Sequence, residues 1–299
     1  MRLGPTRAWI RTILAGAVML ALGAAACGEG PNEGTRPSKR TLCGAAFATE
    51  PEETTQQALD RTDNYYGGLE MVRVFYSDLP DPWPGKLNTN GRPLVVSFKA
   101  NPGEILAGTY DTTLRNWFAT APRDQHIYWS YHHEPEEDIG AGKFSARKYR
   151  KAWAHLRTLA DTADNPRLHA TLILMSWSLE PASGRNWRKY YPGRHVIQVL
   201  GWDTYNRAVD EGRYQDPVDM YARTISISKA EGLPFGIAET GSHLVPGDHG
   251  ERRAAWLRAM TDHLTDAGAL WVAYFDLDWK TGDYRLTDTP SRRAWSDFC

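Results

Sequence analysis

The stretch His126-Ile-Tyr-Trp-Ser-Tyr-His-His-Glu-Pro-Glu-Glu-Asp138 passes from an aromatic, apolar half to a half with two histidines and four acids. The first half has the composition of a buried strand. Pro135 ends that strand, because proline has no N–H to donate to a sheet. Glu134 therefore lies at the C-terminal end of a strand, beside His133. A carboxyl group in apolar surroundings can acquire a raised pKa and act as a general acid, although a solvated acidic loop after a strand is also common.

Strand-like runs recur along the chain with helical or loop material between them, which is the alternation of a parallel α/β fold. Helices are expected at 144–163, with Ser145 as the N-cap, and at 217–231 and 250–267. Neither a Gly-x-Gly-x-x-Gly after the first strand nor a Walker-type Gly-Lys-Ser/Thr is present, which disfavours nucleotide binding. Eight strand-forming runs predict a single (β/α)8 TIM barrel, with strands at 44–48, 71–76, 93–98, 126–131, 169–175, 196–201, 234–238 and 270–275.

Polar, acidic and aromatic residues follow the expected strands, at the rim where a β/α barrel carries its active site. Glu134 ends the fourth strand and Glu239 the seventh, so their side chains converge over the barrel axis. Two carboxyl groups about 5–5.5 Å apart are the equipment of a retaining glycosidase. Tyr205, after the sixth strand, can donate a hydrogen bond that keeps Glu239 anionic, or can be a rim aromatic with a solvated hydroxyl. Three rim tryptophans are candidates for stacking on sugar, namely Trp177, Trp202 and Trp279.

The N-terminus has the features of an export signal. Arg2, Arg7 and Arg11 form a basic region, and an apolar run at 13–26 ends at Cys27. That run is too short and too rich in Ala and Gly for a membrane span. The end of the run is similar to a bacterial lipoprotein processing site, which predicts lipidation of Cys27; simple secretory cleavage nearby is the alternative.

The expected organisation is a lipoprotein-type signal peptide at 1–27, a disordered linker at 28–42 and a catalytic barrel at 43–299. The linker is rich in Gly, Pro, Glu and Lys and has no apolar periodicity. The protein is therefore expected outside the cytoplasm, either anchored to the cell membrane only through a lipid at Cys27 or released.

Composition narrows the choice of partners. The net charge is −1 and no basic stripe is present, which disfavours nucleic acid. The chain has 12 Trp and 14 Tyr, enough to build both a core and a sugar-binding groove. In an oxidising compartment, Cys43 and Cys299 are expected to form a disulfide, because the first strand starts and the last helix ends at the same face of a barrel. A monomer without a cofactor is expected.

Two alternatives to a glycosidase remain open from the residues. One is a metal site built from His132, His133 and the acids that follow them, with help from His243 and His249. Consecutive histidines on a strand point to opposite faces, so both can reach one ion only through a bulge. The other is a sugar-binding lipoprotein without catalytic activity.

Four segments resemble glycoside hydrolase family 26, in the clan of barrels whose catalytic glutamates lie on strands four and seven. They are His133-Glu-Pro-Glu136, Tyr190-Tyr-Pro-Gly193 leading to Gly201-Trp-Asp-Thr-Tyr-Asn206, Ile237-Ala-Glu-Thr-Gly241 and Ala273-Tyr-Phe-Asp276. The similarity extends from about residue 44 to the C-terminus.

The resemblance implies an acid/base role for Glu134 and a nucleophile role for Glu239. It also implies substrate or orienting contacts for His133, Asp203 and Tyr205. Mannan-cleaving members typically have a tryptophan about five residues past the acid/base, where this chain has Ile139. The expected substrate is therefore mannan, β-glucan or another β-linked polysaccharide.

Overall fold

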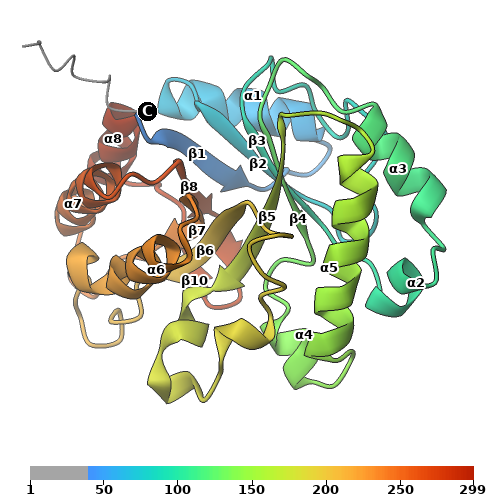
Figure 1. Cartoon of the computed structure of the whole chain (residues 1–299). Helices are drawn as coiled ribbons and strands as arrows, with labels where there is room; N and C mark the ends of the chain where they lie inside the picture. The colour runs from blue at the N-terminus through green and yellow to red at the C-terminus, as the bar shows by residue number, and fades with distance from the viewer. Residues whose placement is uncertain (1–39) are drawn as a thin grey trace, which may run out of the picture. The chain divides into compact units, whose positions relative to one another are not determined.

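Runs of β-branched, aromatic and small apolar residues form the strands of the structure, a computed structural model that describes residues 40–299. Eight strands pair in parallel and in sequence order, and the last pairs with the first, which closes the barrel (Figure 1). The predicted (β/α)8 fold is confirmed. The barrel strands are β1 (Leu42–Phe47), β2 (Met71–Phe75), β3 (Leu94–Phe98), β4 (Ile127–Tyr131), β5 (Leu168–Met175), β6 (Val199–Tyr205), β7 (Phe235–Gly241) and β8 (Trp271–Asp276).

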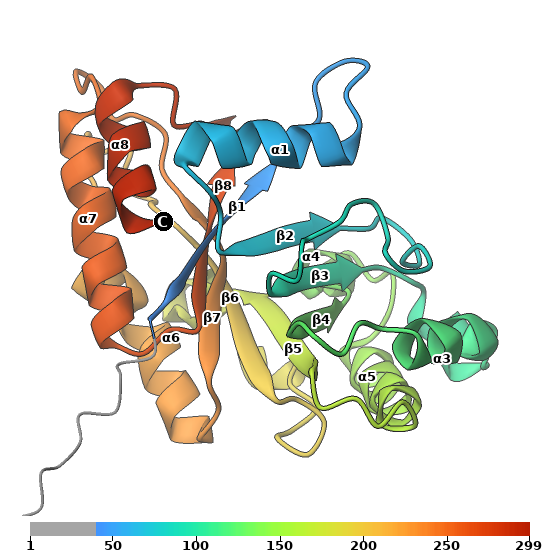
Figure 2. The same ribbon diagram turned by 90° about the horizontal axis from the view of Figure 1, so that it is seen from above.

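Helices lie outside the strands, as Figure 2 shows from above. The three helices predicted from periodicity are present, and Ser145 caps one of them by accepting a hydrogen bond from the backbone N–H of Lys148. The helices are α1 (Thr55–Tyr66), α2 (Pro102–Leu106), α3 (Asp111–Ala119), α4 (Glu136–Gly140), α5 (Ala146–Asp161), α6 (Pro217–Glu231), α7 (Glu251–Asp266) and α8 (Thr289–Phe298). Short 3-10 turns η1 (Ser176–Leu179), η2 (Pro181–Ser183) and η3 (Trp187–Lys189) follow β5, and a small hairpin of β9 (Asp278–Trp279) and β10 (Gly282–Asp283) follows β8.

The barrel begins slightly earlier than the sequence predicted. The linker was expected to run to residue 42, but Leu42 already belongs to β1. Thr41 is fully buried, and its Oγ1 donates to the carbonyl oxygen of Ala269 at 2.8 Å. The signal peptide, Cys27 and linker residues 28–39 lie outside the described residues, so their roles stay predictions. No helix between residues 40 and 299 is both long and apolar enough to cross a membrane.

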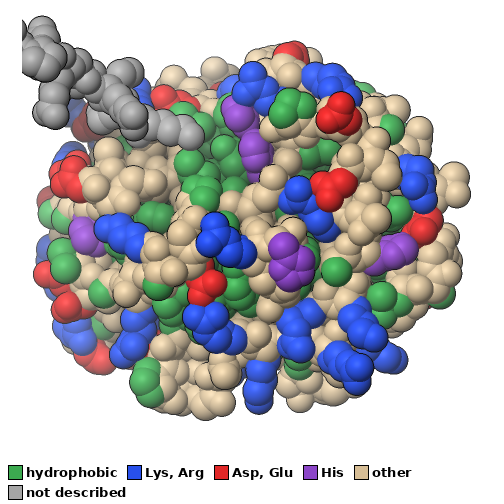
Figure 3. All heavy atoms as spheres, viewed as in Figure 1, with side chains coloured by type: hydrophobic (Ala, Val, Ile, Leu, Met, Phe, Trp, Pro, Cys, Tyr) green, Lys and Arg blue, Asp and Glu red, His purple; other side chains and the backbone are tan. Residues whose placement is uncertain are grey.

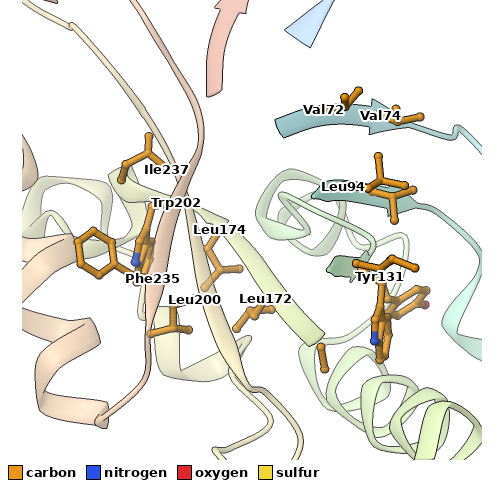
Figure 4. Close-up of a cluster of buried hydrophobic side chains, with 14 of the residues drawn as sticks. Val72, Val74, Leu94, Tyr131, Leu172, Leu174, Leu200, Trp202, Phe235 and Ile237 are labelled. Carbon is orange, nitrogen blue, oxygen red and sulfur yellow. The ribbon is translucent and has the colours of Figure 1, made fainter. Parts of the chain in front are cut away.

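The core has two layers, because successive side chains on a strand point to opposite faces. The outer layer fills the space between strands and helices, and Figure 4 shows part of it, including Trp202, Phe235 and Ile237. The inner layer lies inside the barrel, where Tyr128 and Trp271 pack with ring centroids 4.1 Å apart. Burial of the apolar side chains in both layers supplies the main driving force for folding.

Two strands extend further toward the C-terminal rim than predicted. Strand β6 was expected to end at residue 201 and β7 at residue 238, but they continue to Tyr205 and Gly241. Polar residues normally end a buried strand, yet here Asp203 and Glu239 are register partners on neighbouring strands. Both acids therefore lie inside the mouth of the barrel, on rigid strands.

The predicted disulfide between Cys43 and Cys299 is confirmed, with a Cα–Cα distance of 5.2 Å. Cys43 lies in β1, and Cys299 follows α8, whose end is beside the start of β1 in Figure 1. The Arg40 guanidinium donates to the carbonyl oxygens of Phe298 and Cys299 at 2.8 and 3.0 Å. The first strand and the last helix are thus joined covalently and by hydrogen bonds.

Charged side chains of both signs are scattered over the face drawn in Figure 3, and Lys and Arg predominate in its lower half. Pairs such as Arg157 with Asp161 and Arg188 with Glu231 join some surface charges at 2.7 and 2.6 Å. Surface ion pairs contribute little to stability, so the fold depends on the core and the disulfide.

Candidate active site

Glu239 lies near the end of β7, and both of its carboxylate oxygens have partners. The Arg73 Nη2 atom lies 3.4 Å from Oε1, and the Tyr205 hydroxyl donates to Oε2 at 2.7 Å. Arg73 comes from β2 and Tyr205 from the end of β6, so two other strands hold this one carboxylate of β7. The predicted hydrogen bond from Tyr205 to Glu239 is present.

Arg73 was not identified from the sequence. Its side chain is completely buried, with Nη1 donating to the Ser97 hydroxyl at 2.7 Å and to the Val74 carbonyl at 3.1 Å. The guanidinium carbon lies 3.9 Å from the ring centre of Phe75, a cation–π contact. The available signal was a charged residue at the centre of the apolar run Met-Val-Arg-Val-Phe, where a buried charge needs an opposite charge nearby.

Burial raises the pKa of Glu239, while the charge of Arg73 and the hydrogen bond from Tyr205 act in the opposite direction. The pKa of the Tyr205 phenol is well above its ordinary value, mainly because the group is buried and next because of the Glu239 charge. Tyr205 therefore remains a neutral donor. Arg73 and Tyr205 thus favour the ionised form of Glu239 and orient it, while burial keeps the pKa of Glu239 above its ordinary value.

Glu134 follows β4 in a left-handed backbone conformation, with φ of +47°, and its backbone N–H donates to the carbonyl of Ile173 at 3.1 Å. The pKa of Glu134 is raised to about 8, first by burial and then by the negative charges of Glu239 and Glu136. Glu134 is therefore predominantly protonated at neutral pH, whereas the partners of Glu239 favour its anion.

Asp203 lies beside both glutamates. The residue is 3% exposed, and neither carboxyl oxygen has a hydrogen-bond donor among the described residues. Burial raises the pKa of Asp203 well above its usual range, with Glu239 and Glu134 contributing next. A protonated Asp203 can itself donate to the Glu134 carboxyl group, which accounts for the missing donor.

The two adjacent histidines point to different surroundings. His132 makes a 2.8 Å contact with Asp138 through Nε2 and packs on Phe144, whereas His133 lies against Phe75 with ring centroids 5.5 Å apart. Burial, followed by the charge of Arg73, lowers the pKa of His133 well below its usual value, so the ring is neutral. Within residues 40–299, no three His, Cys, Asp or Glu side chains are grouped to hold a metal ion.

One predicted sugar contact is wrong. Trp202 is fully buried in the outer layer, and its indole N–H donates to the Ser228 hydroxyl of α6 at 3.0 Å. Because Asp203 points into the barrel, its neighbour must point toward the helices. Trp177 and Trp279 are 37% and 53% exposed and remain candidates, with the Arg207 guanidinium stacked 4.4 Å from the Trp177 ring centre.

No protein-family model matches the sequence, and no curated protein matches it either. Solved structures do share the fold. The catalytic domain of a GH26 endo-β-1,4-mannanase from Bacillus sp. JAMB-750 aligns with a TM-score of 0.60 at 13% identity, over 87% of this chain and 85% of that chain. The GH26 β-mannanase BoMan26A from Bacteroides ovatus gives 0.58 at 14%, over 87% and 88%. A glucosidase from Croceicoccus marinus gives 0.58 at 14%, over 87% and 67%. The resemblance to family 26 is thus confirmed at the level of the fold.

Proposed function

We propose that this protein is a retaining glycoside hydrolase that cleaves a β-linked polysaccharide of the mannan or β-glucan type. Glu239 is the nucleophile and Glu134 is the acid/base. The observation that carries the proposal is the contrast between two buried carboxyl groups at one barrel mouth. Arg73 and Tyr205 favour the anion of Glu239, while Glu134 has a pKa of about 8.

The contrast matches the two steps of retaining hydrolysis. In the first step, a carboxylate oxygen of Glu239 attacks the anomeric carbon, the glycosidic bond breaks, and the proton of Glu134 passes to the leaving oxygen. In the second step, Glu134, now ionised, takes a proton from a water molecule that attacks the glycosyl ester. The ester bond breaks and both glutamates return to their starting states.

The surroundings of Glu239 suit this sequence. Arg73 and Tyr205 hold its two oxygens from opposite strands, which limits rotation of the carboxylate before attack. Once Glu239 has become an ester, its negative charge is gone. The loss of that charge lowers the pKa of Glu134 and prepares it to act as a base.

The substrate class rests on the exposed aromatics and on the neighbours in fold. Trp177 and Trp279 offer flat apolar faces near the rim, where a sugar chain can stack. His133 and Asp203 supply polar groups at the centre. The structural neighbours include β-mannanases, an endo-β-mannanase/endo-β-glucanase and a glucosidase, and Ile139 leaves the choice between mannan and glucan open.

The direct test is release of reducing sugar from galactomannan, mixed-linkage β-glucan, carboxymethylcellulose and β-1,3-xylan. The wild type should release sugar from at least one polymer, and Glu239→Ala should lower turnover by several orders of magnitude while binding survives. Proton NMR should show product with the anomeric configuration of the substrate appearing first. Polymer binding without any release would instead identify a sugar-binding protein.

A further inference from the structure

The loop that carries Glu134 has an unusual backbone. His132 and Glu134 have φ angles of +48° and +47°, a region that non-glycine residues rarely adopt. Such conformations persist only where the surroundings hold them, and they are common at active sites. The hydroxyl of Tyr149 contributes by donating to the carbonyls of Tyr131 and His132, each at 3.3 Å.

A stronger attachment comes from Glu136, two residues past the acid/base and the first residue of α4. Its Oε1 atom accepts hydrogen bonds from the backbone N–H of Met175 and the hydroxyl of Ser178, both at 3.0 Å. Met175 ends β5 and is the register partner of Asp203 on β6. Glu136 therefore ties the acid/base loop to the strand next to another site carboxyl group.

The carboxyl group of Glu136 is also buried and ionisable. The residue is 1% exposed, and its second oxygen has no hydrogen-bond partner among residues 40–299. Burial raises its pKa to about 7, although hydrogen bonds to the backbone and Ser178 oppose this. Once ionised, Glu136 raises the pKa of both Glu134 and Asp203.

The other charged and titratable groups around this pair come from several elements. Those acting on Glu134 are Glu239, Asp203 and Lys99, and those near Glu136 are Arg185, Tyr149 and Tyr190. Arg185 also forms an ion pair with the exposed Glu137. Among these groups, only Glu136 both lies two residues after Glu134 in sequence and accepts hydrogen bonds from the end of β5.

We propose that Glu136 is a positioning residue for Glu134: its hydrogen bonds hold the acid/base loop against the end of β5, and its negative charge favours the protonated form of the Glu134 carboxyl group. This proposal rests on the acid/base role of Glu134. One buried side chain thus sets both the position of the Glu134 carboxyl group and the pH range in which that group stays protonated.

The test uses Glu136→Gln, because an amide oxygen can still accept both hydrogen bonds while the charge is removed. Glu180→Gln is the matched control, since Glu180 lies between η1 and η2 and pairs with Arg223 at the surface. In the full chain labelled with ¹³C-glutamate, the carboxyl resonance of Glu134 is assigned by its loss in Glu134→Gln. Its midpoint should fall by about half a pH unit or more in Glu136→Gln and stay unchanged in Glu180→Gln.

The same shift should appear in the alkaline limb of kcat/KM on the polymer that the wild type cleaves. An unchanged Glu134 midpoint in folded Glu136→Gln overturns the proposal, as does an equal shift in Glu180→Gln. The NMR titration needs no substrate, so it tests the role of Glu136 even if no polysaccharide is cleaved. Absence of cleavage would count against the proposed function and not against the role of Glu136. Because the glutamine amide can still accept both hydrogen bonds, Glu136→Gln should fold. Loss of folding, measured by circular dichroism, would also contradict the proposal.

Discussion

At the scale of single residues, the proposed role of Glu239 depends on its two partners, Arg73 and Tyr205. Tyr205→Phe removes the hydrogen bond at Oε2 and should lower kcat by about 10–100-fold, as expected for a lost hydrogen bond to a charged group. It should also move the acid limb of the pH profile upward, because Tyr205 lowers the pKa of Glu239. Tyr284→Phe is the control: its ring lies 5.4 Å from that of Tyr205, but its hydroxyl contacts Thr281. Equal losses in both variants would contradict a specific role.

The pH dependence follows from the opposite states required of the two glutamates. Activity should fall above about pH 8 as Glu134 loses its proton, and fall in acid as Glu239 gains one, at a pH above that of an ordinary glutamate. A kcat/KM profile measures both limbs. An activity that keeps rising past pH 9 would show that Glu134 is not the proton donor.

The same pKa has a consequence for stability. A carboxyl group whose pKa is raised by folding contributes its full stability below the unfolded pKa, and that contribution is lost as the pH rises through the folded value. The free energy of unfolding should therefore decline toward pH 8 on account of Glu134. Denaturant unfolding at pH 5 and pH 8.5 should show a smaller decline for Glu134→Gln than for the wild type.

At the scale of elements, the strand and helix pattern was readable because apolar runs and helical periodicity recur with few exceptions. The ends of β6 and β7 could not be predicted in this way. Polar residues usually end a buried strand, but these two strands continue through Asp203 and Glu239, whose side chains belong to a buried site. The wrong prediction for Trp202 has the same origin. Trp202 and Asp203 are neighbours on a strand and not in a loop, so their side chains point to opposite faces, and Trp202 points away from the barrel interior. Arg73 was missed because its partner, Glu239, is 166 residues away in sequence.

The corrected role of Trp202 predicts a clear difference between two tryptophans. Trp202→Ala should lower the free energy of unfolding by about 3–5 kcal/mol, because it leaves a cavity and removes the hydrogen bond to the Ser228 hydroxyl. Trp279→Ala should change stability by less than about 0.5 kcal/mol and raise KM for the polymer. Denaturant unfolding and steady-state kinetics measure the two effects. Unchanged stability together with a raised KM in Trp202→Ala would instead indicate that Trp202 contacts the substrate.

At the scale of the whole molecule, the disulfide closes nearly the entire described chain, because Cys43 and Cys299 are 256 positions apart in sequence. In the chain-entropy model, a crosslink of that span stabilises by about 4–5 kcal/mol, an upper figure because such bonds often deliver less. Reduction should therefore lower the denaturation midpoint of a Cys27→Ser protein markedly. Thiol titration of that protein, unfolded but unreduced, should find no reactive cysteine; two reactive thiols would contradict the bond.

Covalent trapping tests whether Glu239 forms the glycosyl ester. The protein is incubated with 2,4-dinitrophenyl 2-deoxy-2-fluoro-β-mannoside and with the corresponding β-glucoside, which form the ester but hydrolyse it slowly. The mass of the protein should increase by one fluoroglycosyl group, located by peptide mass spectrometry on Glu239 and absent in Glu239→Ala. An adduct on Asp203 or Glu134, or polysaccharide cleavage that yields the inverted anomer, would contradict the nucleophile role of Glu239.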